Sequence, residues 1–550
     1  MWPFSSHKTR RSAVSQGCHS RATGRRPTHR PRVEALEDRC LLSSGALDPT
    51  FGSGGIVTTA LTKESDYAHG VLVQSNGDLI AYGTADTGSN KFSLSPPASF
   101  GLVRYTPNGS LDTTFGHRGI VITSQVGNTA ITANDFALPF EGVSQAALQA
   151  DGKIVAVGNN LYVVRYNANG SIDTTFGSQG LVVVPSGFST GSLLIQPSNG
   201  DILVGGSYNS QFALLRYTPR GALDPTFGSG GEVVTSSAAG IVVALALENG
   251  DIVAGGGQSL VRYTLSGNLD TTFGAGGIVT IPMGFPSLVV QPNGEIVAVG
   301  TTPAPTGYMG GSIDYIHNEW ELARYNVNGS LDTTFGSGGT VTTSIGGSDH
   351  AYGSAMQSNG QIVVIGYTEA TNDFELGVYN ADGSVDTSFG SSGFVTQASA
   401  TPSNNSGDAW TGGGVAIQPD GKIVAATFAN VGNSSMAAFM LARYGASAAQ
   451  IGSFTASPNP VTAGSSVTLT ASNITLADPT STITQVAFYY IDSSGNQVTL
   501  GTVTVSSGGA WTLTSSTGFG LTTGTYTLYA QAEDSDGILG DPLALTLTVQ

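Results

Sequence analysis

The chain is poor in the residues that carry most protein chemistry. Its 550 residues include only two cysteines, Cys18 and Cys40, and charged residues make up 11%. Both cysteines precede residue 41, so the rest of the chain can form neither a disulfide nor a thiol-based site. No run of 18 or more apolar residues occurs, and no transmembrane segment is therefore expected.

The usual signatures of catalysis are also missing. The main part of the chain has four histidines, and none stands in an HxH or HExxH spacing that would suggest a metal site; they are His69, His117, His317 and His350. No GxSxG, Walker loop or CxxC is present. The sequence therefore favours a non-enzymatic protein and identifies no cofactor.

The net charge of −17 is the sum of a basic N-terminal segment and an acidic remainder. Residues 1–40 carry nine basic and three acidic residues, a net of +6, which leaves about −23 on the remaining 510 residues. An acidic surface repels phosphate backbones and anionic headgroups. Nucleic acid is thus excluded as the expected partner of the folded part.

Glycine is abundant, with 76 residues, and much of it belongs to a motif that occurs seven times. The motif reads Leu/Ile/Val-Asp-x-Thr/Ser-Phe-Gly. Its Asp and Phe pairs are Asp48 and Phe51, Asp112 and Phe115, Asp173 and Phe176, Asp224 and Phe227, Asp270 and Phe273, Asp332 and Phe335, and Asp386 and Phe389. Each copy is followed by an apolar strand that leads into a Gln and a polar-Gly turn, as in VLVQSNGDLIAYG, and then by a strand such as GLVRY. The chain thus repeats one unit seven times.

Each unit predicts four short strands. In the first these are residues 56–59, 71–74, 79–82 and 101–105, with Asn76-Gly77 forming a tight hairpin. Seven four-stranded units and no helical periodicity predict an all-β chain folded as a seven-bladed β-propeller. The repeated Phe would fill each interface between blades. A β-solenoid is the alternative, and the way the ring closes is left open.

The three ordered motifs over residues 46–444 resemble the delta-60 repeat family. That family is defined by its repeats rather than by an activity, so the resemblance implies the fold and an exported bacterial context without a substrate.

Residues 445–450 read as a linker, and residues 451–550 carry alternating Thr-rich and Ser-rich strands. Their spacing predicts an immunoglobulin-like β-sandwich without a disulfide. SPNPVTAGSSVTLTAS and GTYTLYAQAEDSDG resemble strands of bacterial Ig-like modules, which implies a spacer or an adhesive unit.

Residues 1–45 form a basic segment expected to be a disordered leader. Its stretch RVEALEDRCLLSS resembles the LEPR-XLL motif of planctomycete surface proteins, with Asp38 where that motif has Pro. The resemblance implies an extracellular or cell-surface protein. A chance match within a disordered tail is the alternative.

Three groups of residues are candidates for a site. Asp66, Asp135, Asp349 and Asp408 precede the repeat Gln and could bring carboxylates to one rim, where Ca²⁺ is a possible ligand. The simpler interpretation is that each Asp caps its own loop. Trp320 and Trp410 lie in irregular insertions, where an exposed indole could stack on a sugar or could pack its own loop.

The repeated Arg is the third group. Arg104, Arg165, Arg216, Arg262, Arg324 and Arg443 are expected to pair with a repeat Asp rather than contact a ligand. Val378 replaces this Arg in one unit. If the pairing lies within the unit, Asp386 should be the aspartate left without its Arg.

These patterns favour a monomeric, exported or surface-attached binding protein whose propeller rim presents a site for a polysaccharide or a surface protein. The alternatives are an extracellular polysaccharide hydrolase or lyase, which would use paired carboxylates such as Asp66, Asp349 and Asp408, and a purely structural wall component.

Overall fold

A computed structural model describes most of the chain from residue 45 onward. The described residues are 45–87, 98–126, 129–130, 143–158, 161–303, 318–346, 348–368, 373–397, 413–430, 436–445, 449–476, 481–491, 497–535, 540 and 542–550. The basic leader, its LEPR-XLL-like stretch, Asp135, Asp408 and Trp410 lie outside them. Within these ranges no helix is long and apolar enough to cross a membrane.

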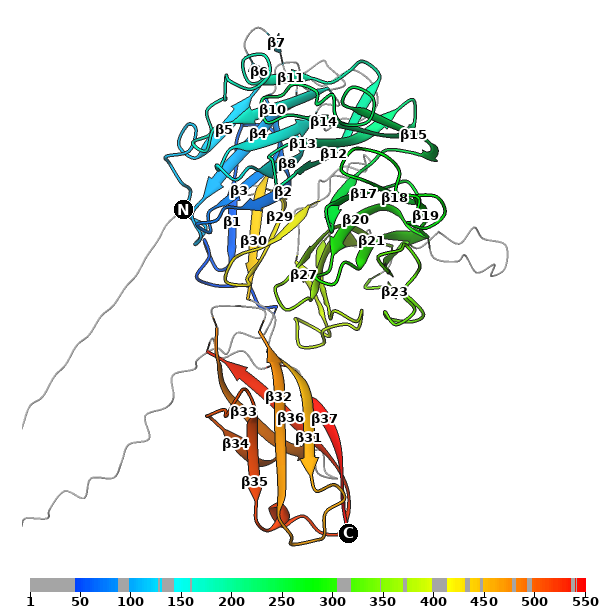
Figure 1. Cartoon of the computed structure of the whole chain (residues 1–550). Coiled ribbons are helices and arrows are strands. Elements are labelled where there is room, and N and C mark those ends of the chain that lie inside the picture. Colours follow the sequence, from blue (N-terminus) through cyan, green and yellow to red (C-terminus); the bar gives the residue numbers. More distant parts are fainter. Residues whose placement is uncertain are drawn as a thin grey trace, which may run out of the picture. The chain divides into compact units, whose positions relative to one another are not determined.

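Seven four-stranded antiparallel sheets form the propeller, and six of them consist of four strands consecutive in the chain (Figure 1). Blade one contains β2 (Asp66–Val73), β3 (Leu79–Asp86), β4 (Ala98–Tyr105) and β5 (Ile120–Thr123). Blade two contains β8 (Val143–Leu148), β9 (Ile154–Gly158), β10 (Tyr162–Tyr166) and β11 (Leu181–Val183). Blade three contains β12 (Phe188–Ile195), β13 (Ile202–Tyr208), β14 (Gln211–Tyr217) and β15 (Glu232–Ala239).

Blade four contains β16 (Ala244–Glu248), β17 (Asp251–Gly256), β18 (Ser259–Tyr263) and β19 (Ile278–Thr280). Blade five contains β20 (Gly284–Val290), β21 (Ile296–Pro303), β22 (Asn318–Tyr325) and β23 (Thr340–Thr343). Blade six contains β24 (Asp349–Met356), β25 (Ile362–Thr368), β26 (Phe374–Tyr379) and β27 (Phe394–Gln397). A small hairpin, β6 (Gln125–Val126) and β7 (Thr129–Ala130), follows blade one.

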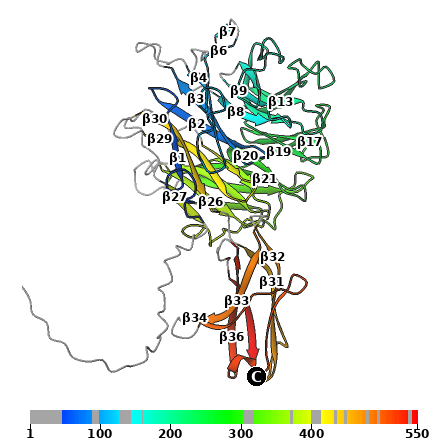
Figure 2. The ribbon, with the colours of Figure 1, turned by 90° about the vertical axis from the view of Figure 1, so that its left-hand side faces the viewer.

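Blade seven joins the two ends of the repeat region. Its strands β28 (Gly414–Ile417), β29 (Ile423–Asn430) and β30 (Ala437–Tyr444) are completed by β1 (Ile56–Thr59), which pairs with β30 in an antiparallel register. Both views show β1 beside β30 (Figures 1 and 2). The strand after each LDTTFG motif is therefore the outermost strand of the preceding blade, and the ring is latched by this one-strand offset.

The predicted role of the repeated Phe follows from its burial. All seven Phe side chains are fully buried. Phe176, between β10 and β11 of blade two, packs against the turn of blade three, where a Cβ on Gly221 would lie 2.9 Å from the Phe ring. Gly221 also has a φ of +83°, which favours glycine. The same close approach of a turn glycine is found at five further repeat Phe rings, so each of these six Phe residues joins one blade to the turn of the next.

The C-terminal part consists of two further sheets around one apolar core. The first contains β31 (Gln450–Ser457), β32 (Val467–Thr475) and β35 (Trp511–Ser515); the second contains β34 (Gln497–Val503), β33 (Ile483–Ile491), β36 (Gly524–Asp534) and β37 (Leu543–Val549). Phe488, Trp511 and Leu528 share its core. A short 3₁₀ turn covers Gly518–Gly520. The immunoglobulin-like class of this part stays a prediction.

Candidate functional site

The repeated Arg forms the same set of bonds in six blades. In blade two, Nε of Arg165 donates to Oδ2 of Asp173 at 2.8 Å, and the guanidinium lies 4.6 Å from the centroid of the Phe176 ring. The same guanidinium donates to the carbonyl oxygen of Pro219, in a turn of blade three. We call this set of bonds the arginine network. The other pairs are Arg104 with Asp112, Arg216 with Asp224, Arg262 with Asp270, Arg324 with Asp332, and Arg443 with Asp48.

These bonds also fix the charge of the aspartate. Burial raises the pKa of Asp173, but hydrogen bonds from Thr175 and the positive charges of Arg165 and Lys153 outweigh it and lower the pKa to about 2. Because each guanidinium binds its own blade and the next one, the repeated Arg has the structural role that the sequence favoured.

Blade six confirms the exception expected at Val378. Asp386 has no arginine, and Nε2 of Gln361 donates to its Oδ2 at 2.7 Å instead. In five blades the pairing joins the Arg to the Asp eight residues later, which opens the next sequence unit, and in blade seven it joins Arg443 to Asp48 of the first unit. The pairing therefore does not lie within one sequence unit, because the outermost strand of a blade belongs to the following unit.

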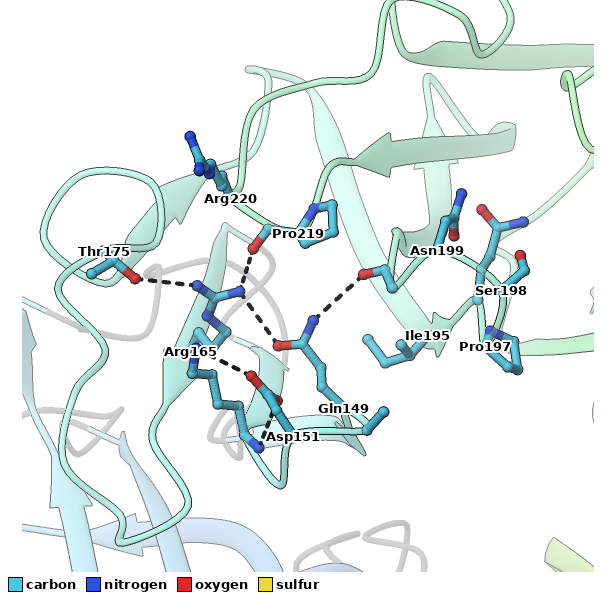
Figure 3. Close-up of a pocket in the computed structure, with 14 residues that line it drawn as sticks. Gln149, Asp151, Arg165, Thr175, Ile195, Pro197, Ser198, Asn199, Pro219 and Arg220 are labelled. Carbon is cyan, nitrogen blue, oxygen red and sulfur yellow. Dashed lines mark hydrogen bonds and ion pairs between the residues drawn. The ribbon is translucent and has the colours of Figure 1, made fainter.

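A hollow of about 770 Å³ lies beside the network between blades two and three (Figure 3). Several of its polar groups bond one another, while Oε1 of Gln196 has no hydrogen-bond partner. Nζ of Lys153 lies 3.2 Å from Asp151 and 3.4 Å from Asp173, and Nε2 of Gln149 donates to the carbonyl oxygen of Gly200 at 3.4 Å. The hollow is therefore better explained as a gap within the arginine network than as a ligand site.

The candidate aspartates that the structure describes are loop caps. Oδ2 of Asp66 accepts hydrogen bonds from the backbone amides of Leu61 and Thr62, and Oδ1 accepts one from the Thr62 hydroxyl. Oδ2 of Asp349 accepts from the amides of Ile345 and Gly346. Both side chains are fully buried, so neither is placed to act as a hydrolase carboxylate on a polymer. In the described residues no three His, Cys, Asp or Glu side chains gather as a metal-ion group.

Trp320 does not lie in an irregular insertion, and the prediction of an exposed sugar-stacking indole is wrong for this residue. Strand β22 begins at Asn318, because its hairpin with β21 extends beyond the repeat motif. The indole is fully buried and packs over blade six. A Cβ on Gly366 would lie 2.6 Å from it, and one on Gly377 would lie 3.0 Å away. Trp320 is a blade-interface residue.

A second cavity, of about 210 Å³, lies where the first strands of all seven blades meet. We call it the axial cavity. Its polar groups come from His69, Tyr82, Gln145, Ser192, Ser287, Tyr352 and Ser354. The residues that line it include no Asp, Glu, Lys or Arg. Hydroxyl, amide and imidazole groups can both donate and accept hydrogen bonds, so this is the polar, uncharged site of the molecule.

A column of the repeat that the sequence analysis missed explains this lining. The residue four positions before the repeat Gln or Glu is small or polar in every unit: Gly70, Gln145, Ser192, Ala244, Ser287, Gly353 and Gly414. Small side chains fit where seven strands converge. This column alternates with apolar residues, and that contrast was the signal available in the sequence.

Two side chains reach the cavity because their strands bulge. The pairing of β2 with β3 shifts register between Ala68 and Gly70, and that of β24 with β25 shifts between Ala351 and Gly353. The extra residue in each bulge is His69 or Tyr352. A bulge turns such a side chain out of the regular alternation, and both of these line the axial cavity.

The polar lining is ordered by its own contacts. The hydroxyl oxygens of Ser287 and Ser354 lie 2.8 Å apart, and Ser192 donates to the carbonyl oxygen of Val242 at 3.0 Å. The ring of Tyr352 stacks on Tyr367, with centroids 5.2 Å apart. The cavity therefore offers positioned hydroxyl groups and an aromatic wall.

Six segments of the chain match a family model described as a domain of unknown function (DUF5122) beta-propeller. They are residues 74–115, 149–176, 198–227, 247–273, 310–335 and 357–389. The segments end at the repeat Phe, and the seventh unit is the one split by ring closure between β30 and β1. The chain is thus similar to a family of repeat β-propellers whose function is unknown. The delta-60 resemblance is consistent with this only at the level of the repeat propeller.

No curated protein matches the chain significantly. Among solved structures, Raptor of Chaetomium thermophilum is 8% identical with a TM-score of 0.38; the match covers 72% of this chain and 28% of Raptor. The Pan2 WD40 domain of Neurospora crassa is 9% identical with a TM-score of 0.37, over 69% of this chain and 96% of that domain. The polysaccharide lyase Uly1 is 12% identical with a TM-score of 0.37, over 68% and 89%. Similarity this low carries no inference about ligand or chemistry.

Proposed function

We propose that this β-propeller protein binds the end of a neutral polysaccharide in its axial cavity, without turning it over. The observation that carries the proposal is the uncharged polar lining, in which Ser192, Ser287 and Ser354 come from three different blades. Sugars present rows of hydroxyl groups that both donate and accept hydrogen bonds. The hydroxyl and amide groups of the lining can hydrogen-bond to these sugar hydroxyls, and an aromatic ring such as Tyr352 offers a face for stacking.

The size of the cavity limits the ligand. A volume of about 210 Å³ is several times the roughly 30 Å³ that one water occupies in the liquid. It is smaller than the roughly 300–1,000 Å³ typical of drug-sized ligands. One sugar unit at the end of a chain fits this range, whereas an internal segment of a long polymer does not.

The resemblances to surface-protein motifs and bacterial Ig-like modules are compatible with this proposal. An exported or cell-surface location and a C-terminal Ig-like spacer would present the propeller to polysaccharide outside the cell. Ca²⁺ remains a proposal for the rim at Asp135 and Asp408, which lie outside the described residues.

The test is titration calorimetry with neutral hexasaccharides, namely cellohexaose, laminarihexaose and xylohexaose, beside an anionic oligogalacturonate. We expect at least one neutral sugar to bind more tightly than the anionic one, since the residues that line the cavity include no Lys or Arg. Ser287→Ala and Ser354→Ala should each weaken binding roughly three- to tenfold, the value of one hydrogen bond.

Ser229→Ala is the matched control, because Ser229 is exposed in the turn before the outermost strand β15. It should leave the affinity unchanged. Binding that is insensitive to Ser287→Ala and Ser354→Ala would overturn the axial site. Absence of binding by every sugar would favour the structural wall component.

A further inference from the structure

Two buried carboxyl groups in blade six each have an oxygen without a hydrogen-bond partner. Asp349 begins β24 and Glu375 is the second residue of β26; their exposed fractions are 0% and 1%. Oδ1 of Asp349 and Oε2 of Glu375 have no partner. An unpaired buried acceptor destabilises the folded state, and more so when it is charged. Two such groups in one blade therefore require an explanation.

Blade one shows which donor blade six has lost. Its loop cap Asp66 receives a hydroxyl hydrogen bond from Thr62 at 2.9 Å. The corresponding loop amide in blade six belongs to Gly346, which has no hydroxyl. A Cβ at Gly346 would lie 3.5 Å from Oγ1 of Thr368 and 4.0 Å from Oε1 of Glu375, so the Glu375 carboxyl lies close to the loop position that Thr62 holds in blade one.

The chain around the pair is poor in cations, since residues 325–421 contain neither Lys nor Arg. Arg324 on β22 is bound to Asp332 in the arginine network. The other titratable groups on the described elements packed around the pair are His350 and Tyr352 on β24, Tyr379 on β26 with Asp373 before it, Glu319, Glu321 and Tyr325 on β22, and Tyr367 on β25, while β27 carries none. Burial, together with the negative charges of Asp349 and Asp373, raises the pKa of Glu375 to about 8.

Blade five supplies a contrast at the same repeat position. Glu321 corresponds to Glu375, and each lies opposite a threonine of the outermost strand. The Thr342 hydroxyl donates to Oε2 of Glu321 at 2.7 Å. Oε2 of Glu375 receives no such bond. The unpaired acid is thus specific to blade six.

We propose that Asp349 and Glu375 share one proton at neutral pH, with the Glu375 carboxyl donating to Asp349 as the Thr62 hydroxyl donates to Asp66. Loss of this proton leaves two adjacent buried charges and loosens the beginning of β24.

The pair is connected to the axial cavity through stacked rings. His350, next to Asp349, stacks on Tyr367 at 4.8 Å, and Tyr367 stacks on Tyr352 at 5.2 Å. Strand β24 also supplies Ser354 to the cavity. This part of the inference rests on the proposed function. Loss of the shared proton makes ligand binding in the axial cavity weaker at alkaline pH.

Thermal unfolding of the full chain at pH 5 to 9, for the wild type and Glu375→Gln, tests the shared proton. The carboxamide of Gln donates to Asp349 at every pH. A carboxyl whose pKa is raised in the folded state stabilises fully below its unfolded pKa and loses this contribution as pH rises to about 8. The wild-type midpoint should therefore fall relative to Glu375→Gln up to pH 8 and then stay constant, several degrees lower at pH 9.

Asp349→Asn removes the negative charge beside Glu375, so the fall in the unfolding midpoint should move to lower pH. Asp66→Asn is the matched control, because blade one has Gly101 at the position of Glu375. It should lower the midpoint without altering its change between pH 6 and 9. A constant difference between the wild type and Glu375→Gln from pH 5 to 9 overturns the shared proton.

The dissociation constant of the tightest neutral hexasaccharide, measured at pH 6 and 9, tests the link to the cavity. We expect weaker binding at pH 9 for the wild type and no change for Glu375→Gln. Equal constants for the wild type overturn the link. If no hexasaccharide binds, the proposed function fails, and the unfolding curves still decide whether the proton is shared.

Discussion

Blade one carries Arg104 and Gly101 at the positions where blade six carries Val378 and Glu375. In blade one the aspartate of the arginine network has a guanidinium partner at 2.7 Å. In blade six, Gln361 donates to Asp386 at 2.7 Å. The comparison teaches that the fold needs a buried donor beside each repeat aspartate, and that the donor can be neutral.

The same comparison separates charge from packing. Arg104 also lies over Phe115 at 4.8 Å and donates to a carbonyl oxygen of blade two. Val378 is fully buried but can do neither. Six blade interfaces therefore combine an ion pair, a ring contact and a bond to the next blade, while the interface after blade six relies on apolar packing and Gln361.

The largest expected effect comes from removing Arg262, which holds two carboxylates, one of them almost fully buried. Arg262→Ala leaves Glu248, at 2.6 Å, and Asp270, at 2.7 Å, without their cation. Breaking such a buried pair should lower the free energy of unfolding by about 3–5 kcal/mol. Val378→Ala, the matched truncation in blade six, should cost roughly 1–2 kcal/mol. Urea denaturation measures both, and equal losses would contradict a stabilising network.

Gln361→Ala should have the next largest effect. Gln361 and Asp386 are both about 1% exposed, so the truncation leaves a buried carboxylate oxygen without its donor. A hydrogen bond to a charged group contributes about 2–3 kcal/mol, and we expect a loss of this size in urea denaturation. Gln361→Glu should be still less stable at neutral pH and recover on acidification, because it places a second carboxylate beside Asp386. An unchanged unfolding free energy for Gln361→Ala would show that blade six needs no donor.

The propeller was predictable because LDTTFG recurs in register with two other motifs, and the burial of Phe51 and its six equivalents follows from that repetition. Ring closure was not predictable, since an outermost strand pairs equally well within its own unit or with the preceding one. Trp320 was misplaced because hairpin length depends on partners outside the motif.

The candidate site was less accessible to sequence reasoning. The loop-cap interpretation of Asp66 and Asp349 was available from turn chemistry. The axial lining required knowing which face of each first strand points to the axis, and the two bulges that turn His69 and Tyr352 inward have no clear sequence signal.

The smallest expected effect is that of acid on a blade that contains the arginine network. The pKa of Asp173 is lowered from an ordinary value of 3.8 to about 2, so its stabilising contribution is complete above pH 4 and is lost as pH falls toward 2. Relative to Asp173→Asn, the wild type should be more stable by about 2 kcal/mol at pH 6 and should lose this advantage by pH 2. Urea denaturation at pH 6, 4, 3 and 2 measures the difference. If the difference stays constant over this range, the arginine network stabilises the blades by packing and hydrogen bonding alone. The neutral donor Gln361 of blade six would then stabilise its aspartate as well as an arginine does.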